Sequence, residues 1–443
     1  MNSDGICYKE QLTFLKYINA NYLFYSITIL AFASVFFLTW ILSKYTFFEK
    51  QKIPRGKLPK FPYGNFRDVI KQETSLHVFI WKNFLRFKKR GCKFGGLFLF
   101  MRPVVILVED DLRIKEQPEK SLIDLNKKVL NNFVNNFACT IKAPLQDKLE
   151  KNQDALFVLK EFLLESTCLL FGFQPNKIVE DINKLLKDKY KSTFKYYLYL
   201  TVFKNIDNEV YNQKVLLDII NQRKKNDLRE HDLIDLFIKS YNESKLEDIT
   251  REIFNLFANI LSYSSSTLLF CLYELANNEE IRGEVIGEIR RFTKKNTTIT
   301  SENLDELNYL EAVVKETLRK YPPVATEISN RNLQNQNFLT FKSILALHRN
   351  SQNYIKPEAF DPDRFASEQL FKPGIFLPFG SSTENAHLYM ELVSLQVILV
   401  MTSIFSTLDV KMKEGVTDNF KFNTKLLYLS PCEDLNLVFR KIS

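Results

Sequence analysis

The sequence is poor in the residues that build glycine-rich and disulfide-bonded folds. Only 12 of its 443 residues are glycine, and no C-x-x-C pair occurs. The six cysteines lie far apart, at positions 7, 92, 139, 168, 271 and 432. Few glycines disfavour a dinucleotide-binding fold, and this cysteine spacing predicts neither a disulfide framework nor a zinc site. We also find no internal repeat and no long low-complexity tract, and we expect no metal site.

The excess of positive charge is small, and it is not concentrated in a patch that would indicate nucleic-acid binding. Lys and Arg together number 61 against 52 acidic residues, which gives a net charge of +9. The basic residues are spread along the chain, and no nucleic-acid-binding module is recognisable. We therefore expect no nucleic-acid partner. Attraction to an anionic membrane surface is the preferred interpretation.

Hydrophobic residues are abundant, at 45% of the chain, and 39 of them are phenylalanine. The length permits one large domain or two to three ordinary ones. With few glycines, this composition favours packed helices around a large core.

An uncharged apolar run extends from Leu23 to Leu42, reading LFYSITILAFASVFFLTWIL. About twenty residues of helix match the ~30 Å hydrocarbon thickness of a bilayer, so we predict a transmembrane helix over residues 22–43. A cleaved signal peptide is the alternative, but the run is too long for one and lacks a clear small-residue cleavage site.

The flanks of this span differ in charge. Six basic residues follow it, at positions 44, 50, 52, 55, 57 and 60, and only two lysines precede it. The positive-inside rule then predicts a single-pass protein of the endoplasmic reticulum with a cytosolic domain. The alternative is the mitochondrial inner membrane with a domain in the matrix. We predict four segments: a tail (1–21), the anchor (22–43), a basic, proline-rich hinge (44–65) and one folded domain (66–443).

Hydrophobic patterns along that domain predict mainly helices. Residues 77–116 read as helix, glycine stop, two short strands turning at 101–103 and a new helix. Further helices are predicted over 155–173 and, apolar on nearly every face, over 253–280. The run ILALHRN at 344–350 is predicted to be a strand.

Three motifs near the C-terminal end carry a family resemblance. LNYLEAVVKETLRKYPPV at 307–324 places Glu316 and Arg319 three apart on one helix face, followed by a proline stop. PEAFDPDRF at 357–365 supplies Arg364, and FLPFGSSTENAHLYMELVSLQ at 376–396 contains Phe379 and Gly380. Together they resemble the K helix, the P-E-R-F region and the haem-ligand loop of the cytochrome P450 family.

The resemblance implies the mainly α fold of that family with a small β-sheet, preceded here by one transmembrane helix. It also implies that Glu316, Arg319 and Arg364 form a buried structural network. In the family, the loop presents a cysteine thiolate to haem iron. At that position this chain has Ala386, which has no metal-binding atom, and Glu384 replaces the arginine that pairs with a haem propionate. His387 is an alternative iron ligand one residue along.

The helix over 253–280 also departs from the family pattern. Aligned from its ELANNEE end, residues 259–264 read NILSYS where the family has A-G-x-[DE]-T-T, so the oxygen-relay acid is missing. We therefore expect no cofactor and no catalytic residues. The predicted function is a haem-free pseudoenzyme, acting as a membrane-anchored scaffold or accessory subunit with other membrane proteins as partners. The alternatives are a divergent haem monooxygenase that oxidises a lipophilic substrate, and a lipid- or sterol-binding protein.

Overall fold

A computed structural model describes most of the chain. The described residues are 4–109, 125, 127–140, 142–150, 155–173, 214–226, 231–240, 246–296, 298–333, 336–365, 374–381, 385–414, 420–432 and 435–442. The predicted new helix near residue 110 and most of residues 176–242 lie outside this part of the chain.

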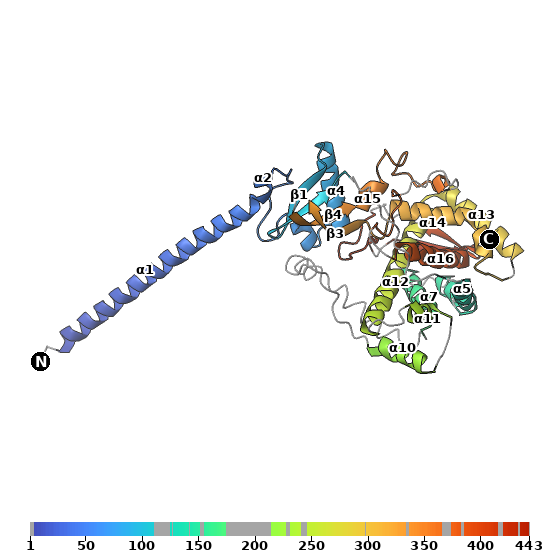
Figure 1. The fold of residues 1–443 in the computed structure, drawn as a ribbon, viewed down its shortest axis with the longest axis horizontal. Coiled ribbons are helices and arrows are strands. Elements are labelled where there is room, and N and C mark those ends of the chain that lie inside the picture. The colour runs from blue at the N-terminus through green and yellow to red at the C-terminus, as the bar shows by residue number, and fades with distance from the viewer. Residues whose placement is uncertain are drawn as a thin grey trace.

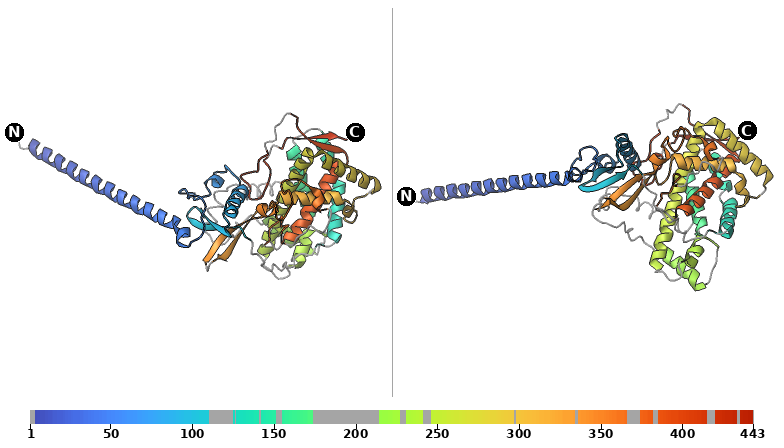
Figure 2. Two further views of the ribbon diagram at one scale, coloured as in Figure 1. Left: turned by 90° about the horizontal axis from the view of Figure 1, so that it is seen from above. Right: turned by 45° about the horizontal axis from the view of Figure 1, so that its top comes forward.

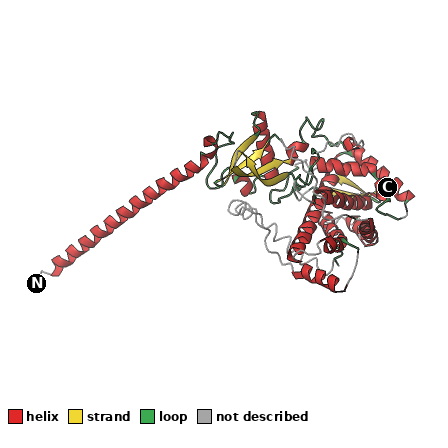
Figure 3. Ribbon diagram, viewed as in Figure 1, coloured by secondary structure: helices red, strands yellow, loops and turns green. Residues whose placement is uncertain are grey.

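The N-terminal third combines a long helix with a small sheet. Its elements are α1 (Asp4–Tyr45), α2 (Phe47–Lys50), α3 (Arg67–Ile70), α4 (Leu76–Lys89), β1 (Phe94–Leu99) and β2 (Arg102–Leu107). Helix α1 projects from the body as a long rod, and the strands gather at its C-terminal end (Figures 1 and 3). It contains the candidate span Phe24–Tyr45, of which only 6% is buried in the fold. An apolar helix of this length is therefore available to a membrane, as the sequence predicts.

Helices dominate the middle of the chain. They are α5 (Lys127–Thr140), α6 (Lys142–Glu150), α7 (Ala155–Leu170), α10 (Lys214–Asn226), α11 (Leu233–Ser240), α12 (Leu246–Asn277) and α13 (Glu279–Lys295). The C-terminal part contains η1 (Asn303–Glu306), α14 (Asn308–Lys320), β3 (Thr326–Leu333), β4 (Gln336–Ser343), α15 (Ile344–His348), η2 (Pro362–Phe365), α16 (Ala386–Phe405), β5 (Leu408–Met412) and β6 (Leu437–Lys441). The predicted mainly helical fold with a small sheet is confirmed.

The main sheet joins strands from both ends of the domain in the order β1-β2-β4-β3. Strands β1 and β2 are antiparallel, β2 and β4 are parallel, and β4 and β3 are antiparallel. The turn between β1 and β2 falls at residues 100–101, close to the predicted position. Strands β5 and β6 form a separate antiparallel pair.

Short-range chemistry explains where α4 begins and ends. The Ser75 hydroxyl accepts a hydrogen bond from Val78 N at 3.2 Å and caps the first turn. Gly91, with φ +66°, follows the last turn. A Cβ on Gly95 would lie 2.3 Å from the Phe87 ring, so this glycine lets α4 pack closely on β1.

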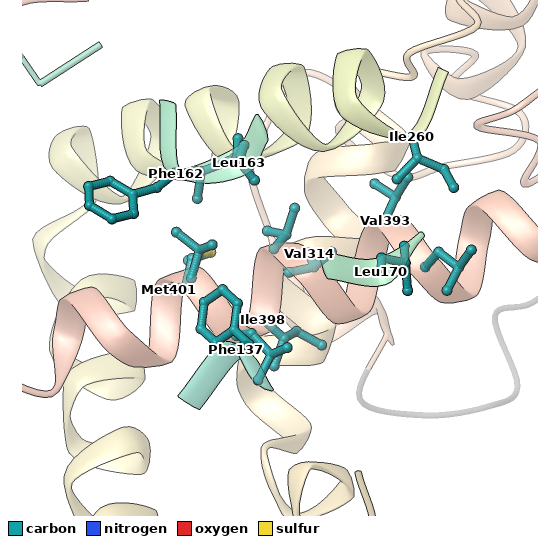
Figure 4. Close-up of a cluster of buried hydrophobic side chains, with 14 of the residues drawn as sticks. Phe137, Phe162, Leu163, Leu170, Ile260, Val314, Val393, Ile398 and Met401 are labelled. Carbon is teal, nitrogen blue, oxygen red and sulfur yellow. The ribbon is translucent and has the colours of Figure 1, made fainter. Parts of the chain in front are cut away.

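The core of the helical body lies where α7, α12, α14 and α16 meet. Figure 4 shows Ile260 of α12, Val393 of α16 and Leu170 of α7 pointing toward one another, with Val314 of α14 nearby. Two of these helices, α12 and α16, are apolar enough to span a membrane, but they are 83% and 78% buried inside the protein. They are core helices, and burial of nearly their whole circumference explains why they are apolar on all faces.

One prediction of secondary structure is wrong. Residues 344–348 form helix α15, where the sequence analysis expected a strand. The hydroxyl of Ser343 accepts a hydrogen bond from Ala346 N at 3.1 Å and caps this short helix. The apolar run ILAL does not distinguish a strand from a buried helical turn, and the cap decides the outcome.

Candidate functional site at the start of α16

The loop that the sequence analysis identified leads directly into α16. Phe379 is buried, and Gly380 adopts φ +87°, a left-handed conformation that glycine tolerates best. Ala386 is the first residue of α16, and its methyl group packs against the main core. Glu384 lies outside the described residues.

His387, the alternative ligand, is placed on the solvent side of α16. It is exposed in the first turn of this helix. A side chain on that face points away from the core against which Ala386 packs. The geometry therefore gives no support to His387 as a ligand.

Aromatic rings from α12 and α16 meet beside this loop. The ring centroid of Tyr263 lies 5.6 Å from that of Phe379 and 5.3 Å from that of Tyr389. Asn259 Nδ2 donates a hydrogen bond to Tyr389 Oη at 2.9 Å, and burial raises the pKa of Tyr389 to about 12. Helix α12 is thus in direct side-chain contact with the loop and with the first turn of α16.

A buried polar network one turn farther along was missed by sequence reasoning. Ser264 Oγ donates to Gln396 Oε1 at 2.6 Å, and Gln396 Nε2 donates to Ser166 Oγ at 3.3 Å and to Thr167 Oγ1 at 3.2 Å. The network joins α12, α16 and α7. Its only sequence signal is a lone glutamine in an apolar run. A serine inside a helix commonly bonds back to its own backbone, whereas Ser264 bonds across to α16.

A second unpredicted cluster ties the loop to the main sheet. Both the backbone N–H and the hydroxyl of Ser381 donate to Glu327 Oε2, at 3.2 Å and 2.7 Å. Lys342 Nζ donates to Ser381 Oγ at 3.3 Å, and Glu327 and Lys342 are cross-strand partners on β3 and β4. Because both charged side chains are more than nine-tenths buried, this cluster holds the loop at one place on the sheet.

Glu316, Arg319 and Arg364 are brought together at the end of α14. Arg319 Nε and Nη2 donate to Glu316 Oε2 and Oε1 at 2.6 Å and 2.8 Å, a bidentate pair with both side chains fully buried. Arg364 Nε lies 3.5 Å from Glu316 Oε1. Burial raises the pKa of Glu316, and the bonds from Arg319 oppose that shift. These contacts fix the positions of α14 and η2 relative to each other.

His348 extends this network to the loop. Its Nδ1–H donates to Arg319 O, and its Nε2 accepts from Leu377 N, both at 2.9 Å. Burial lowers the pKa of His348 to about 3, so the ring is neutral at physiological pH. Neither ring nitrogen is free to bind a metal in this arrangement.

The family model described as Cytochrome P450 matches residues 115–435, which include α12, α14 and the loop before α16. The chain belongs to the cytochrome P450 family.

Curated members of this family resemble the chain at low identity. Cytochrome P450 6l1 of Blattella germanica is 29% identical over 239 residues, which cover 50% of this chain and 47% of the relative. Cytochrome P450 6A1 of Musca domestica is 30% identical over 194 residues, or 38% of each chain. The chain spans about half the length of the first curated relatives it matches. Cytochrome P450 6k1 of Blattella germanica is 24% identical over a match that covers 90% of this chain and 93% of the relative.

Membership in this family corrects one expectation. The sequence analysis expected no cofactor, but the family match makes haem the cofactor to expect for this cytochrome P450. That expectation was wrong because it was drawn from single positions of the loop and of the helix over 253–280, whereas the match extends over most of the domain.

The residues at the start of α16 do not fit the thiolate ligation of cytochrome P450 haem. Ala386 offers no donor atom, and the neighbouring Tyr263, Phe379 and Tyr389 rings contact one another. Among the residues that the structure describes, no group of three or more His, Cys, Asp or Glu side chains is arranged to hold a metal ion.

Proposed function

We propose that this member of the cytochrome P450 family acts as a membrane-anchored scaffold or accessory subunit of a membrane protein complex. The observation that carries the proposal is Ala386 at the first residue of α16, where the family has its cysteine ligand. Without a thiolate, the family's oxygen activation lacks the electron donation that it needs. The proposal rests on the missing thiolate ligand, so it holds whether or not the chain binds haem.

The retained parts of the molecule support this function. The buried pair of Glu316 and Arg319 keeps the scaffold in register, and α1 supplies an apolar helix of membrane length. A buried ion network contributes positioning and performs no chemistry of its own. The features that this chain shares with the family therefore support a stable fold anchored to a membrane, and they do not require catalysis.

The finer location belongs to the same proposal. By the positive-inside rule, the basic residues after the span support a domain on the cytosolic side of the endoplasmic reticulum, and a matrix domain at the mitochondrial inner membrane is the alternative. Protease digestion of intact microsomes tests it. Digestion of the domain without detergent is expected, and full protection would contradict the assigned side.

The experiment for the proposed function has two measurements on the full-length chain. The reduced protein with carbon monoxide should lack the shifted Soret band of a thiolate-ligated haem, and gentle detergent extraction should yield a complex with other membrane proteins. The variant Ala386→Cys is the matched control that shows whether the side chain alone accounts for the missing band. A thiolate-type band in the unaltered protein, or a monomer with no co-purifying protein, would contradict the proposal.

A second candidate function is a divergent haem monooxygenase that oxidises a lipophilic substrate. The comparisons favour it more directly than the scaffold, because the family match and the reported relatives are all cytochromes P450. Its test is oxygen transfer: with a reductase and NADPH, a lipophilic substrate should gain one oxygen atom. Such a product from the unaltered chain, absent with heat-treated protein, would establish this function over the scaffold.

A further inference from the structure

The C-terminal end of the membrane helix is packed into the main sheet. Ile41, Tyr45 and Phe48 are buried in one cluster with Phe98 of β1 and Phe338 of β4. The Tyr45 hydroxyl also donates to Phe100 O at 3.2 Å. This interface fixes the direction of the C-terminal end of α1 relative to the main sheet, because a rotation of the helix away from the sheet would break the buried aromatic contacts. Figures 1 and 2 show the helix meeting the body at this end.

One turn of the hinge reaches back along the membrane helix. We call it the hinge turn, residues 57–64. The ring of Phe61 lies 5.9 Å from the ring of Phe37, centroid to centroid. Phe37 is four residues before Ile41, the first residue of α1 in that cluster, so at 1.5 Å per residue the contact is ~6 Å back along α1 from the sheet. The hinge turn therefore lies beside the span rather than above it.

Residues of α1 indicate the depth of that contact. Trp40 stacks on Phe37 at 6.1 Å, and Lys44 Nζ lies 5.6 Å from the centre of the Trp40 ring. Tryptophan and a following lysine are typical of the boundary between hydrocarbon and headgroups. Phe37 is one turn deeper than Trp40, so Phe61 is level with that boundary or below it.

The hinge turn has the chemistry of an interfacial segment. Leu58 is 72% exposed and Phe61 50% exposed, and the neighbouring Lys57 and Lys60 are exposed as well. Apolar side chains flanked by lysines fit the layer where acyl chains meet anionic headgroups. Because α1 crosses the bilayer, it holds the bilayer next to this surface. A soluble partner is not held there in this way.

The backbone of the hinge turn is also suited to that layer. Lys60 N donates to Gly64 O and Gly64 N donates to Lys60 O, both at 2.8 Å, while two prolines contribute no N–H. Asn65 Nδ2 donates to Lys57 O at 2.7 Å, and Asn65 Oδ1 accepts from Phe98 N at 2.8 Å. Transfer of the hinge turn into the poorly hydrated interfacial layer costs less free energy when its backbone N–H and C=O groups are already hydrogen-bonded.

We infer that the hinge turn is a membrane-binding site: Leu58 and Phe61 insert into the interfacial layer beside α1, and Lys57 and Lys60 bind anionic lipid headgroups. The main sheet is held against that leaflet in one orientation. This site is independent of the chemistry at Ala386 and goes beyond the proposed function.

The test measures depth with tryptophan and brominated lipids. The chain has two tryptophans, Trp40 and Trp81, and a protein with both replaced by phenylalanine is the background. Into it, Phe61→Trp, Leu58→Trp and Ile355→Trp are introduced singly. Ile355 is 79% exposed and follows α15, which lies across the sheet from α1 in Figure 1, so it is the matched control. Each full-length protein is reconstituted in phosphatidylcholine vesicles with and without phosphatidylserine.

The reference is a Trp81→Phe protein, whose remaining Trp40 lies on the membrane helix. In brominated vesicles, the fluorescence of the Phe61→Trp and Leu58→Trp proteins is expected to be quenched by as large a fraction as that of this reference. The fluorescence of the Ile355→Trp protein should not be quenched. Charge reversal by Lys57→Glu with Lys60→Glu should reduce quenching of the Phe61→Trp protein in phosphatidylserine vesicles and leave it unchanged in phosphatidylcholine alone. Circular dichroism confirms that each variant is folded, and position 58 serves if the variant at 61 does not fold.

Absence of quenching at both 58 and 61 would overturn insertion, and equal quenching at 355 would overturn the fixed orientation. No effect of phosphatidylserine would overturn the headgroup site. None of these outcomes depends on haem, on a co-purifying protein or on turnover, so failure here is distinguishable from failure of the proposed function.

Discussion

The imidazole of His348 accepts a hydrogen bond from the backbone N–H of Leu377 at 2.9 Å, and its other nitrogen donates to Arg319 O. Through this one ring, the end of α14 holds the loop that leads to Phe379. The ring can fill both roles only while it is neutral, because a protonated imidazole has no acceptor. Acid should therefore release the loop from α14.

The pH dependence follows from the lowered pKa. Burial lowers the pKa of His348 to about 3 from an ordinary 6.5. Below pH 6.5 the unfolded chain takes up a proton at this ring and the folded chain does not, so stability is present above that pH and is lost as pH falls toward 3. The loss is ~1.4 kcal/mol per pH unit below 6.5. Buried His77, with a pKa lowered to about 4, adds a similar loss.

Thermal unfolding in detergent between pH 7.5 and 5 checks this expectation. The melting temperature should fall with pH, and His348→Gln should reduce the slope at the cost of a lower melting temperature throughout. The exposed His231 is the control, and His231→Gln should leave the slope unchanged. A slope unaffected by the His348 substitution would show that this ring is not held neutral.

Glu316→Ala should destabilise the domain strongly. It removes the partner of the fully buried Arg319 and the acceptor of Asp361 N at 2.9 Å. An uncompensated buried charge costs ~3–5 kcal/mol. Glu311→Ala on the same helix is the matched control, because the Glu311–Lys315 pair is far more exposed and such pairs contribute ~0–1 kcal/mol. Equal melting temperatures for the two variants would refute the buried network.

Gly172, which follows α7, tests whether the backbone at this position lies against the side chain of Asp232. With φ +67°, a side chain there costs about 1–2 kcal/mol in backbone strain. In addition, a Cβ would lie 1.7 Å from Asp232 Oδ2, in the pair that Asp232 forms with Arg223. Gly172→Ala should therefore cost more than Gly91→Ala, which has a similar φ of +66° and nothing within 4 Å of its Cβ. Equal losses in denaturant unfolding would mean that the contact with Asp232 is absent.

The sequence predicted those elements whose signals are local or repeated. An uncharged run predicts α1, all-round apolarity predicts α12, and the spacing of Glu316 and Arg319 predicts their pairing. Those signals lie within a few residues of one another. They are sufficient because each pattern can be recognised without knowing which distant residues the element contacts.

The unpredicted features depend on partners far apart in the chain. Gln396 meets Ser264 across 132 residues, and Ser381 meets Glu327 across 54. Nothing near a lone glutamine or serine in the sequence identifies such a partner. The conformation of residues 344–348 was predicted incorrectly because one serine cap decides between two structures for the same apolar run.

The last prediction concerns that distant pair. Gln396→Leu removes the acceptor of Ser264 and the donor to Ser166 and Thr167, all inside a fully buried core. A buried polar group left without its partner costs ~1–3 kcal/mol, so this nearly isosteric change should lower the melting temperature. The further change Ser264→Ala in the same protein should restore part of the loss, because it removes the stranded hydroxyl.

Ser394 provides the matched control on α16. Its hydroxyl is buried and has no hydrogen-bond partner among the described residues, so Ser394→Ala should leave the melting temperature unchanged or raise it. Parallel thermal melts of the four proteins in one detergent decide the matter. If Gln396→Leu is as well tolerated as Ser394→Ala, the network does not hold α7, α12 and α16 together, and hydrophobic packing alone accounts for the contact between these helices.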